Sequence, residues 1–327
     1  MAKWKVYVTR LLPPKAMEAL YNNPDLEVEV NPEDRPLTRE ELLEKVKGRD
    51  ALITQLVDKI DAEVMDAAKG VKIIANYAVG YDNIDVAEAT ERGILITNTP
   101  GVLTDTTADL AWALLFAAAR CLIPADKFTR EGKYKGWAPM LFLGQEITGK
   151  TLGVIGSGRI GTAFAKKSKG FDMKVLYNDV NPNPRFEEET GGKFVDKETL
   201  LKESDFVSLH VPLLPSTRHL ISEKEFKMMK NTAILINTSR GPVVDEKALV
   251  KALKEGDIWA AGLDVYENEP ELAPGLTELE NAVLLPHIAS ATIETRTKMG
   301  LMDVENIVAA LNGQLPPNCV NPEAFKK

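Results

Sequence analysis

The stretch TLGVIGSGRIG at residues 151–161 joins a short apolar run to three closely spaced glycines and leads into a helical pattern. Gly156 and Gly158 permit a tight turn and a close approach of the backbone to a ligand, and Gly161 allows the helix to pack closely on the strand. The first amides of that helix are unpaired and carry partial positive charge, which suits phosphate groups. The order strand, glycine turn and helix predicts a dinucleotide-binding turn; the alternative is a glycine turn in a fold that binds no nucleotide.

The next apolar run, KVLYND, ends in a carboxylate that indicates which dinucleotide binds. Asp179 follows Gly161 by 18 residues, and a carboxylate at this place accepts hydrogen bonds from the ribose hydroxyls of the adenosine. The same charge repels the 2′-phosphate of NADP, so NAD(H) is favoured. Arg185 lies six residues further on and could reach a 2′-phosphate, which leaves NADP(H) open.

Short apolar runs alternate with helical patterns along most of the chain. Five runs (KVYVT, LEVEV, ALIT, KIIAN and ILITN) precede residue 100, and six more follow residue 150. Strands separated by helices predict parallel sheets, so we expect an α/β fold with two open parallel-sheet domains. Longer helical patterns cover residues 104–119 and 292–311, and we expect the tail to pack on the first half of the chain.

The composition excludes several classes of protein. The 327 residues carry 48 acidic and 40 basic side chains, and the formal charge of −8 argues against nucleic acid as a partner. The two cysteines, Cys121 and Cys319, are far apart, so we expect neither a disulfide scaffold nor a bound metal. The longest apolar run, residues 111–119, is too short to span a membrane. We therefore expect a cytoplasmic protein that contacts no membrane.

Ionisable residues follow several predicted strands, at the edge of an open parallel sheet where ligands bind. His287 follows AVLLP, Arg240 follows AILINTS, and Asp264 is the last residue but one of AAGLDV, with Glu269 in the loop after it. Taken singly, His287 could be a hydrogen-bonded core histidine and the others solvated loop charges or ion pairs. Taken together, Arg240 offers a carboxylate clamp, His287 a proton donor, and Glu269 a charge that stabilises the protonated donor. Hydride transfer to a 2-oxo acid requires this combination.

The chain has two histidines besides His287. His210 ends a predicted strand just before Val211 and Pro212, and it either lines an adenosine pocket or only packs. His219 lies in a polar loop, and we expect no function for it.

Over nearly its full length the chain resembles the D-2-hydroxyacid dehydrogenase family. The resemblance is carried by YAVGYDNIDV, GVIGSGRIG, ILINTSRGPVVDE, GLDVYENEP and LLPHIASAT, which begin at Tyr77, Gly153, Ile234, Gly262 and Leu284. Within the family, the segment REGKYKGWAPMLFLGQEITGKTLG is most similar to glyoxylate and hydroxypyruvate reductases.

The resemblance implies a subunit of two domains. Residues 101–288 would form a Rossmann NAD-binding domain, and residues 1–100 with 289–327 a discontinuous, flavodoxin-like substrate domain. Residues 104–149 would build a homodimer.

The resemblance also assigns roles to individual residues. The catalytic residues would be Arg240, Glu269 and His287, and the substrate contacts Leu56, Val79, Gly80 and Arg240. The implied cofactor contacts are Thr104, Gly156, Gly158, Arg159, Ile160, Gly161, Asp179, His210, Val211, Pro212, Thr217, Thr238, Asp264 and Ser290.

The expected activity is NAD(P)H-dependent reduction of a small 2-oxo acid, glyoxylate or hydroxypyruvate, with His287 as general acid and base. Two alternatives remain. The first is a dehydrogenase of the D-3-phosphoglycerate type, although we expect no appended regulatory domain after Lys327. The second is an NAD-sensing binding protein like the corepressors that share this fold.

Overall fold

The structure, a computed structural model, describes residues 3–325. The two residues at each end lie outside the described part, and with them residues 1 and 327, at which the predicted substrate domain begins and ends. The chain divides into two compact units. Unit 1 comprises Met1–Leu103 and Ser290–Lys327, and unit 2 comprises Thr104–Ala289.

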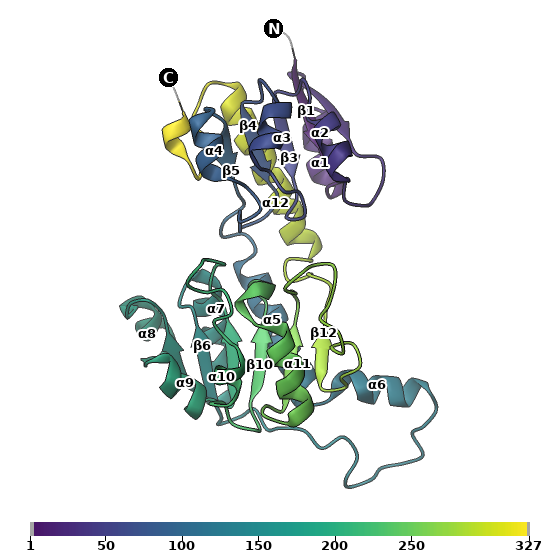
Figure 1. Cartoon of the computed structure of the whole chain (residues 1–327), viewed down its shortest axis with the longest axis vertical. Helices are drawn as coiled ribbons and strands as arrows, with labels where there is room; N and C mark the ends of the chain where they lie inside the picture. Colours follow the sequence, from purple (N-terminus) through teal and green to yellow (C-terminus); the bar gives the residue numbers. More distant parts are fainter. Residues whose placement is uncertain (1–2, 326–327) are drawn as a thin grey trace. The chain divides into compact units, whose positions relative to one another are not determined.

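Unit 1 is built on a parallel sheet of five strands in the order β2-β1-β3-β4-β5 (Figure 1). The strands are β1 (Trp4–Val8), β2 (Leu26–Val30), β3 (Ala51–Thr54), β4 (Ile73–Asn76) and β5 (Leu95–Thr97). Because successive strand side chains face opposite ways, Val6 and Ile53 join one apolar core while Tyr7 and Leu52 join another. The five strands predicted from the sequence are thereby confirmed.

Helices cover both faces of this sheet. One face carries α1 (Pro14–Tyr21) and α12 (Ile293–Leu311), and the other carries α2 (Arg39–Lys45), α3 (Ala62–Ala67) and α4 (Val86–Glu91). The tail contributes α12, whose Val304 and Ile307 lie in the core with β1 and β3, and the short helix η3 (Pro322–Ala324). The tail therefore packs on the first half of the chain, as expected.

Unit 2 contains a parallel sheet of seven strands in the order β12-β11-β10-β9-β6-β7-β8. The strands are β6 (Thr151–Ile155), β7 (Lys174–Asn178), β8 (Lys193–Phe194), β9 (Phe206–Leu209), β10 (Ile234–Asn237), β11 (Ala260–Leu263) and β12 (Ala282–Leu284). The strand order reverses beside β6, which pairs with β7 on one side and with β9 on the other. Open parallel sheets bind ligands at the carboxyl ends of strands beside such a reversal.

The helices of unit 2 also form two layers. The core on one face includes residues from α5 (Thr104–Ala119), α7 (Arg159–Lys167) and α8 (Pro184–Thr190). The core on the other includes residues from α9 (Lys197–Glu203), α10 (Glu223–Phe226) and α11 (Glu246–Glu255). The prediction of an α/β fold with two parallel sheets is confirmed.

Local sequence signals explain where several helices begin. Thr38 and Glu41 form a reciprocal capping box before α2, and the side chains of Asp245 and Thr292 accept amide hydrogen bonds at the starts of α11 and α12. These caps satisfy amides that have no partner within the helix.

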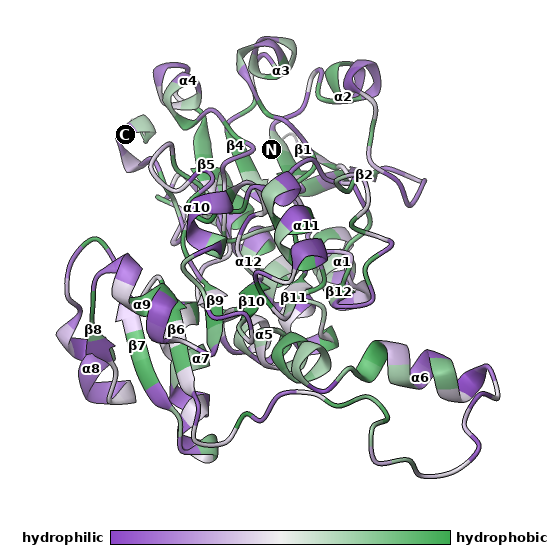
Figure 2. Cartoon of the chain, turned by 60° about the horizontal axis from the view of Figure 1, so that its bottom comes forward, coloured by the Kyte–Doolittle hydropathy of each residue, from purple (hydrophilic) through white to green (hydrophobic). Residues whose placement is uncertain are grey.

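One segment of unit 2 reaches away from the sheet. Cys121 adopts a left-handed backbone conformation between α5 and α6 (Leu122–Arg130), and α6 has no buried residue. Figure 2 shows α6 and the loop after it projecting from the rest of the unit. Within the described residues no single helix is long and apolar enough to cross a membrane, although α5 and α6, bent by 65°, meet the length and composition limits as a pair.

Candidate active site

The glycine turn connects β6 to α7 and has room for a ligand on one side only. Gly156 has a φ of +99°, and a Cβ atom there would lie 2.6 Å from the carbonyl oxygen of His210. A Cβ atom on Gly161 would overlap the carbonyl oxygen of Gly156, whereas one on Gly158 would meet nothing within 4 Å. No side chain caps the first turn of α7, which begins at Arg159. The open side and uncapped amides fit a pyrophosphate group.

Asp179 follows β7 and is held against this turn. Its Oδ2 atom accepts hydrogen bonds from the amide and the hydroxyl of Ser157, each 2.7 Å long, and its Oδ1 atom accepts one from the amide of Val180. Burial alone would raise the pKa of Asp179, but these bonds outweigh it and lower that pKa. Asn183 donates to the carbonyl oxygen of Ser157 at 2.9 Å. Sequence reasoning missed Ser157 and Asn183.

Arg185, which the sequence suggested could bind the 2′-phosphate of NADP(H), forms an ion pair with Glu189. Its Nε atom lies 2.6 Å from Oε1 of Glu189, one turn along α8, and its side chain is 85% exposed. The charge of Arg185 is therefore paired with Glu189 and not with Asp179.

His210 follows β9, the neighbour of β6. Its Nε2 atom lies 2.9 Å from the hydroxyl of Ser208, and its ring packs on Phe164. Burial lowers the pKa of His210 to about 3, so the imidazole is neutral at physiological pH. The residues after it form a turn that Thr217 holds, because its hydroxyl donates to the carbonyl oxygen of Pro212 at 2.7 Å.

His287 and Glu269 form a direct pair. Glu269 follows β11 and His287 follows β12, and Nδ1 of His287 lies 2.9 Å from Oε2 of Glu269. The other carboxylate oxygen accepts a hydrogen bond from the amide of Tyr266 at 3.0 Å. Burial would raise the pKa of Glu269, but His287, the Tyr266 amide and the charge of Arg240 outweigh it and lower that pKa. The carboxylate is therefore ionised beside the imidazole.

Asp264, the residue after β11, holds the loop that carries His287. It is fully buried, and its two oxygens accept hydrogen bonds from the amides of Ile288 (2.8 Å) and Ala289 (2.7 Å). Burial raises the pKa of Asp264 despite these bonds. His287 has a φ of +55°, a left-handed conformation that side chains seldom adopt. The buried carboxylate thus stabilises a strained backbone at the histidine.

Arg240 lies in a turn that Asn237 shapes. Asn237 ends β10, donates to the carbonyl oxygen of Arg240 at 3.0 Å, and accepts from the amide of Ser239 at 3.0 Å. Thr238 lies in the same turn, and its hydroxyl is buried without a hydrogen-bond partner among the described residues. A buried, unsatisfied hydroxyl is costly in a protein alone, which fits its predicted contact with a cofactor.

The predicted substrate contacts in unit 1 lie in two loops at one sheet edge. Leu56 follows β3, and Val79 and Gly80 follow β4. Asn83 joins these loops, since its amide donates to the carbonyl oxygen of Gln55 at 3.1 Å. Sequence reasoning missed Asn83.

The two remaining predicted contacts lie where the chain passes between the units. Thr104 begins α5 in unit 2, and Ser290 begins the second segment of unit 1.

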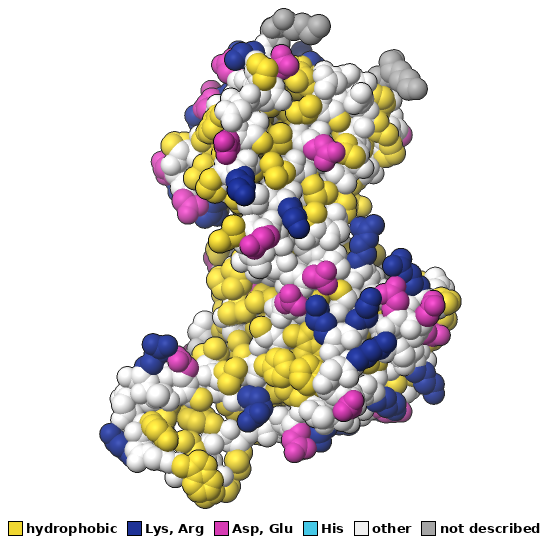
Figure 3. Space-filling view, turned by 180° about the vertical axis from the view of Figure 1, so that it is seen from behind, with side chains coloured by type: hydrophobic (Ala, Val, Ile, Leu, Met, Phe, Trp, Pro, Cys, Tyr) yellow, Lys and Arg dark blue, Asp and Glu magenta, His cyan; other side chains and the backbone are white. Residues whose placement is uncertain are grey.

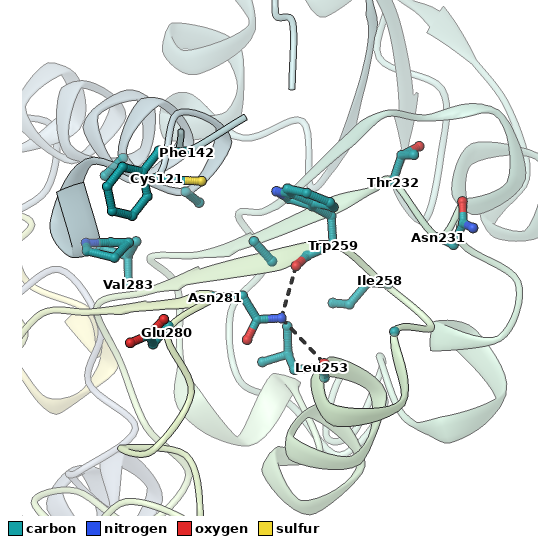
Figure 4. A pocket seen from close by; sticks show the side chains of 15 residues that line it. Cys121, Phe142, Asn231, Thr232, Leu253, Ile258, Trp259, Glu280, Asn281 and Val283 are labelled. Carbon is teal, nitrogen blue, oxygen red and sulfur yellow. Dashed lines mark hydrogen bonds between the residues drawn. The ribbon is translucent and has the colours of Figure 1, made fainter. Parts of the chain in front are cut away.

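A cavity of about 580 Å³ lies elsewhere in unit 2 (Figure 4). Its lining includes Thr232, Trp259 and Asn281, which precede β10, β11 and β12. Since Arg240, Asp264 and His287 follow those same strands, the cavity lies at the opposite edge of the sheet and is no part of the candidate site.

Comparison with known proteins identifies the family of the chain. Residues 112–289 match the sequence model of the D-isomer specific 2-hydroxyacid dehydrogenase, NAD binding domain. The chain is 54% identical to a glyoxylate reductase of Thermococcus litoralis over 327 residues, covering 99% of this chain and 98% of that protein.

Solved structures extend the comparison. A protein from Thermus thermophilus superposes with a TM-score of 0.91 at 49% identity, covering 97% of this chain and 99% of that one. An NADPH-dependent glyoxylate/hydroxypyruvate reductase from Sinorhizobium meliloti, solved with NADP and malonate, gives a TM-score of 0.86 at 32% identity, covering 100% and 99%. The chain thus belongs to the D-isomer specific 2-hydroxyacid dehydrogenase family and is an NAD(P)-dependent oxidoreductase with a Rossmann-type domain.

Proposed function

We propose that this enzyme reduces glyoxylate or hydroxypyruvate to the 2-hydroxy acid, of D configuration where the product is chiral, and that it prefers NADH. One observation carries the proposal: the ionised Glu269 holds His287 at 2.9 Å, on the strand edge that also carries Arg240 and the glycine turn. The names of the relatives from T. litoralis and S. meliloti support the two substrates.

We assign the cofactor to unit 2. The glycine turn, with the amides of Arg159 and Ile160, would hold the pyrophosphate, and Asp179 the adenosine ribose. The turn from His210 to Pro212 would flank the adenosine, and Thr238 would bond the cofactor with its buried hydroxyl. When bound, the reduced nicotinamide supplies a hydride to the carbonyl carbon of the substrate.

We assign the proton to His287. Because Nδ1 faces Glu269, Nε2 is the nitrogen left to donate a proton to the carbonyl oxygen. The negative charge of Glu269 stabilises the imidazolium before that transfer. In the reverse direction, the neutral imidazole accepts the proton of the 2-hydroxyl group.

The remaining assignments concern the substrate. In unit 2, Arg240 would offer a planar fork to the substrate carboxylate. In unit 1, Val79 and Gly80 would supply backbone amides to the substrate. Leu56 would limit the size of the group on the carbonyl carbon. In this proposal, unit 1 is therefore the substrate domain.

We also propose that the enzyme is a homodimer built on residues 104–149. Large apolar side chains are exposed on α6 and the loop after it, among them Trp137 (84%) and Met140 (76%). Figure 3 shows apolar side chains gathered on this projecting segment at the lower left. The apolar cavity beside Cys121 and Phe142 lies next to it. Exposed apolar surface of this extent is typical of a protein interface, and a second copy of the chain would cover it.

Steady-state kinetics tests the proposed reaction. The purified enzyme is assayed with glyoxylate, hydroxypyruvate, pyruvate and 3-phosphohydroxypyruvate, each with NADH and with NADPH. The proposal expects the highest kcat/KM with glyoxylate or hydroxypyruvate and NADH. Turnover of 3-phosphohydroxypyruvate alone would favour a phosphoglycerate-type dehydrogenase, and NADH binding without turnover would favour a binding protein.

A further inference from the structure

A second histidine–carboxylate pair lies outside the proposed site. The Nε2 atom of His219 lies 2.6 Å from Oε1 of Glu267. The Glu267 side chain is only 16% exposed, and that of His219 is 39% exposed. The sequence suggested no function for His219, yet its partner stands two residues before Glu269.

Glu267 is fixed at its backbone as well as at its carboxylate. Its amide donates to Oε1 of Glu246, at the start of α11, over 2.6 Å. The other oxygen of Glu246 accepts from the amide of Ala273 at 3.0 Å. Glu246 is nearly fully buried, and burial raises its pKa. The loop that carries Glu269 is thus held at Glu267 and at Ala273.

His219 is tied to the turn that carries Arg240. Its amide donates to the carbonyl oxygen of Pro242 at 2.8 Å, and its φ is +51°. Gly241, between Arg240 and Pro242, has no room for a Cβ atom because the carbonyl group of Tyr266 occupies that space. One end of the pair therefore holds the arginine turn, and the other end holds the glutamate loop packed against that turn.

We propose that His219 and Glu267 are positioning residues that fix the Arg240 turn relative to the Glu269 loop. The inference rests on the proposed function, since it takes Arg240 to bind the substrate carboxylate and Glu269 to orient His287. The pair would act on both groups indirectly. It acts through Pro242 and Gly241 on one side and through the two-residue link to Glu269 on the other.

The backbone at His219 permits a matched pair of variants. Asparagine tolerates a left-handed conformation, so His219→Asn preserves the turn, but its side chain is too short to reach Glu267. His219→Gln places an amide donor at about the reach of Nε2 and should restore the bond. Arg218→Gln is the control, because Arg218 lies 3.7 Å from the same carboxylate oxygen in the same loop with a side chain 56% exposed.

The kinetic readout separates positioning from stability. At 25 °C, His219→Asn should lower kcat and raise KM for glyoxylate, reducing kcat/KM by roughly five- to tenfold, the scale of one typical hydrogen bond. KM for NADH should stay within about twofold, His219→Gln should recover most of the loss, and Arg218→Gln should match wild type, as exposed pairs usually do. Unchanged kinetics in His219→Asn, or a loss that His219→Gln does not reverse, would overturn the proposal.

Hydrogen exchange of the full-length protein gives a readout without turnover. His219→Asn should speed the exchange of amides in residues 266–273, where Glu267 and Ala273 donate to Glu246, and leave the sheet unchanged. Faster exchange in His219→Asn, in an enzyme that reduces neither glyoxylate nor hydroxypyruvate, would support the positioning role of His219 and Glu267 and refute the proposed reaction. If wild type reduces glyoxylate while exchange and kinetics are unaffected in His219→Asn, the proposed reaction stands and the positioning role of His219 and Glu267 is refuted.

Discussion

The imidazole of His287 and the carboxylate of Glu269 meet at 2.9 Å although 18 residues separate them in the chain. The contact depends on the pairing of β11 with β12, which brings the ends of the two strands together. Asp264 fixes the histidine side of this contact, and the Tyr266 amide fixes the glutamate side.

Replacing His287 by alanine should remove the proton donor and leave cofactor binding nearly intact. We expect kcat for glyoxylate to fall by roughly a hundredfold or more, the usual scale for a lost general acid. The dissociation constant of NADH, measured by fluorescence titration, is the control and should hardly change. A variant with near wild-type kcat would exclude His287 from the mechanism.

Arg240→Lys keeps the positive charge and loses the planar fork. We expect KM for the oxo acid to rise and kcat to fall together, because lysine cannot bind a carboxylate through two parallel hydrogen bonds. The constants are measured at saturating NADH. Equal kcat/KM in the variant and wild type would show that the fork plays no part.

Asp179 sets the expected preference for NADH. Its carboxylate is ionised, and Arg185 is paired with Glu189. Asp179→Ala should therefore improve kcat/KM with NADPH, since it removes a negative charge from the place of the 2′-phosphate. Glu189→Gln is the companion variant, because it frees Arg185 and should also favour NADPH. A wild-type enzyme that prefers NADPH would contradict this assignment.

The sequence predicts the fold well because strands and helices leave periodic patterns. The helical pattern at residues 104–119 coincides with α5, and the predicted runs locate every strand except β8. That strand, Lys193–Phe194, has only two residues at the sheet edge and leaves no pattern. Its register with Leu176 and Tyr177 is set by the neighbouring strand.

The candidate site is less predictable, because loop contacts join residues that no local pattern connects. Residues at strand ends, such as Arg240 and His287, can be located from the strands alone. The pair of His219 and Glu267 spans 48 residues and two loops, and the bond from Asn237 to the Arg240 carbonyl depends on a turn that the sequence does not specify.

His210 should make the protein less stable in acid. Its pKa is about 3 in the folded chain, below the ordinary value of 6.5. Between these two pH values the unfolded chain binds a proton at His210 and the folded chain does not. The contribution of neutral His210 to the free energy of unfolding is therefore complete above about pH 6.5 and is lost as the pH falls toward 3. The loss is at most about 1.4 kcal/mol per pH unit. Because part of the residue stays accessible to water, we expect less than that limit.

Thermal unfolding of wild type and His210→Gln between pH 7 and pH 4.5 checks this dependence. The two curves should converge as the pH falls, since glutamine does not titrate. Ser208→Ala is the control: it removes the hydrogen-bond partner of His210 and keeps the buried imidazole. Parallel curves for wild type and His210→Gln would show that His210 does not carry the acid sensitivity.

The exposed apolar segment predicts the state of assembly. An obligate dimer of this kind would bury roughly 2,000 Å² or more, and sedimentation at micromolar concentration should give twice the chain mass of 36.0 kDa. Trp137→Asp with Met140→Asp should shift the protein toward the monomer, because two charges would then be buried in an apolar interface. Leu11→Asp, at a 64% exposed position in unit 1, should not. If the segment also supports the active site of the neighbouring subunit, activity should fall as the dimer dissociates. A fully active wild-type monomer would refute both the dimer and this support of the neighbouring site.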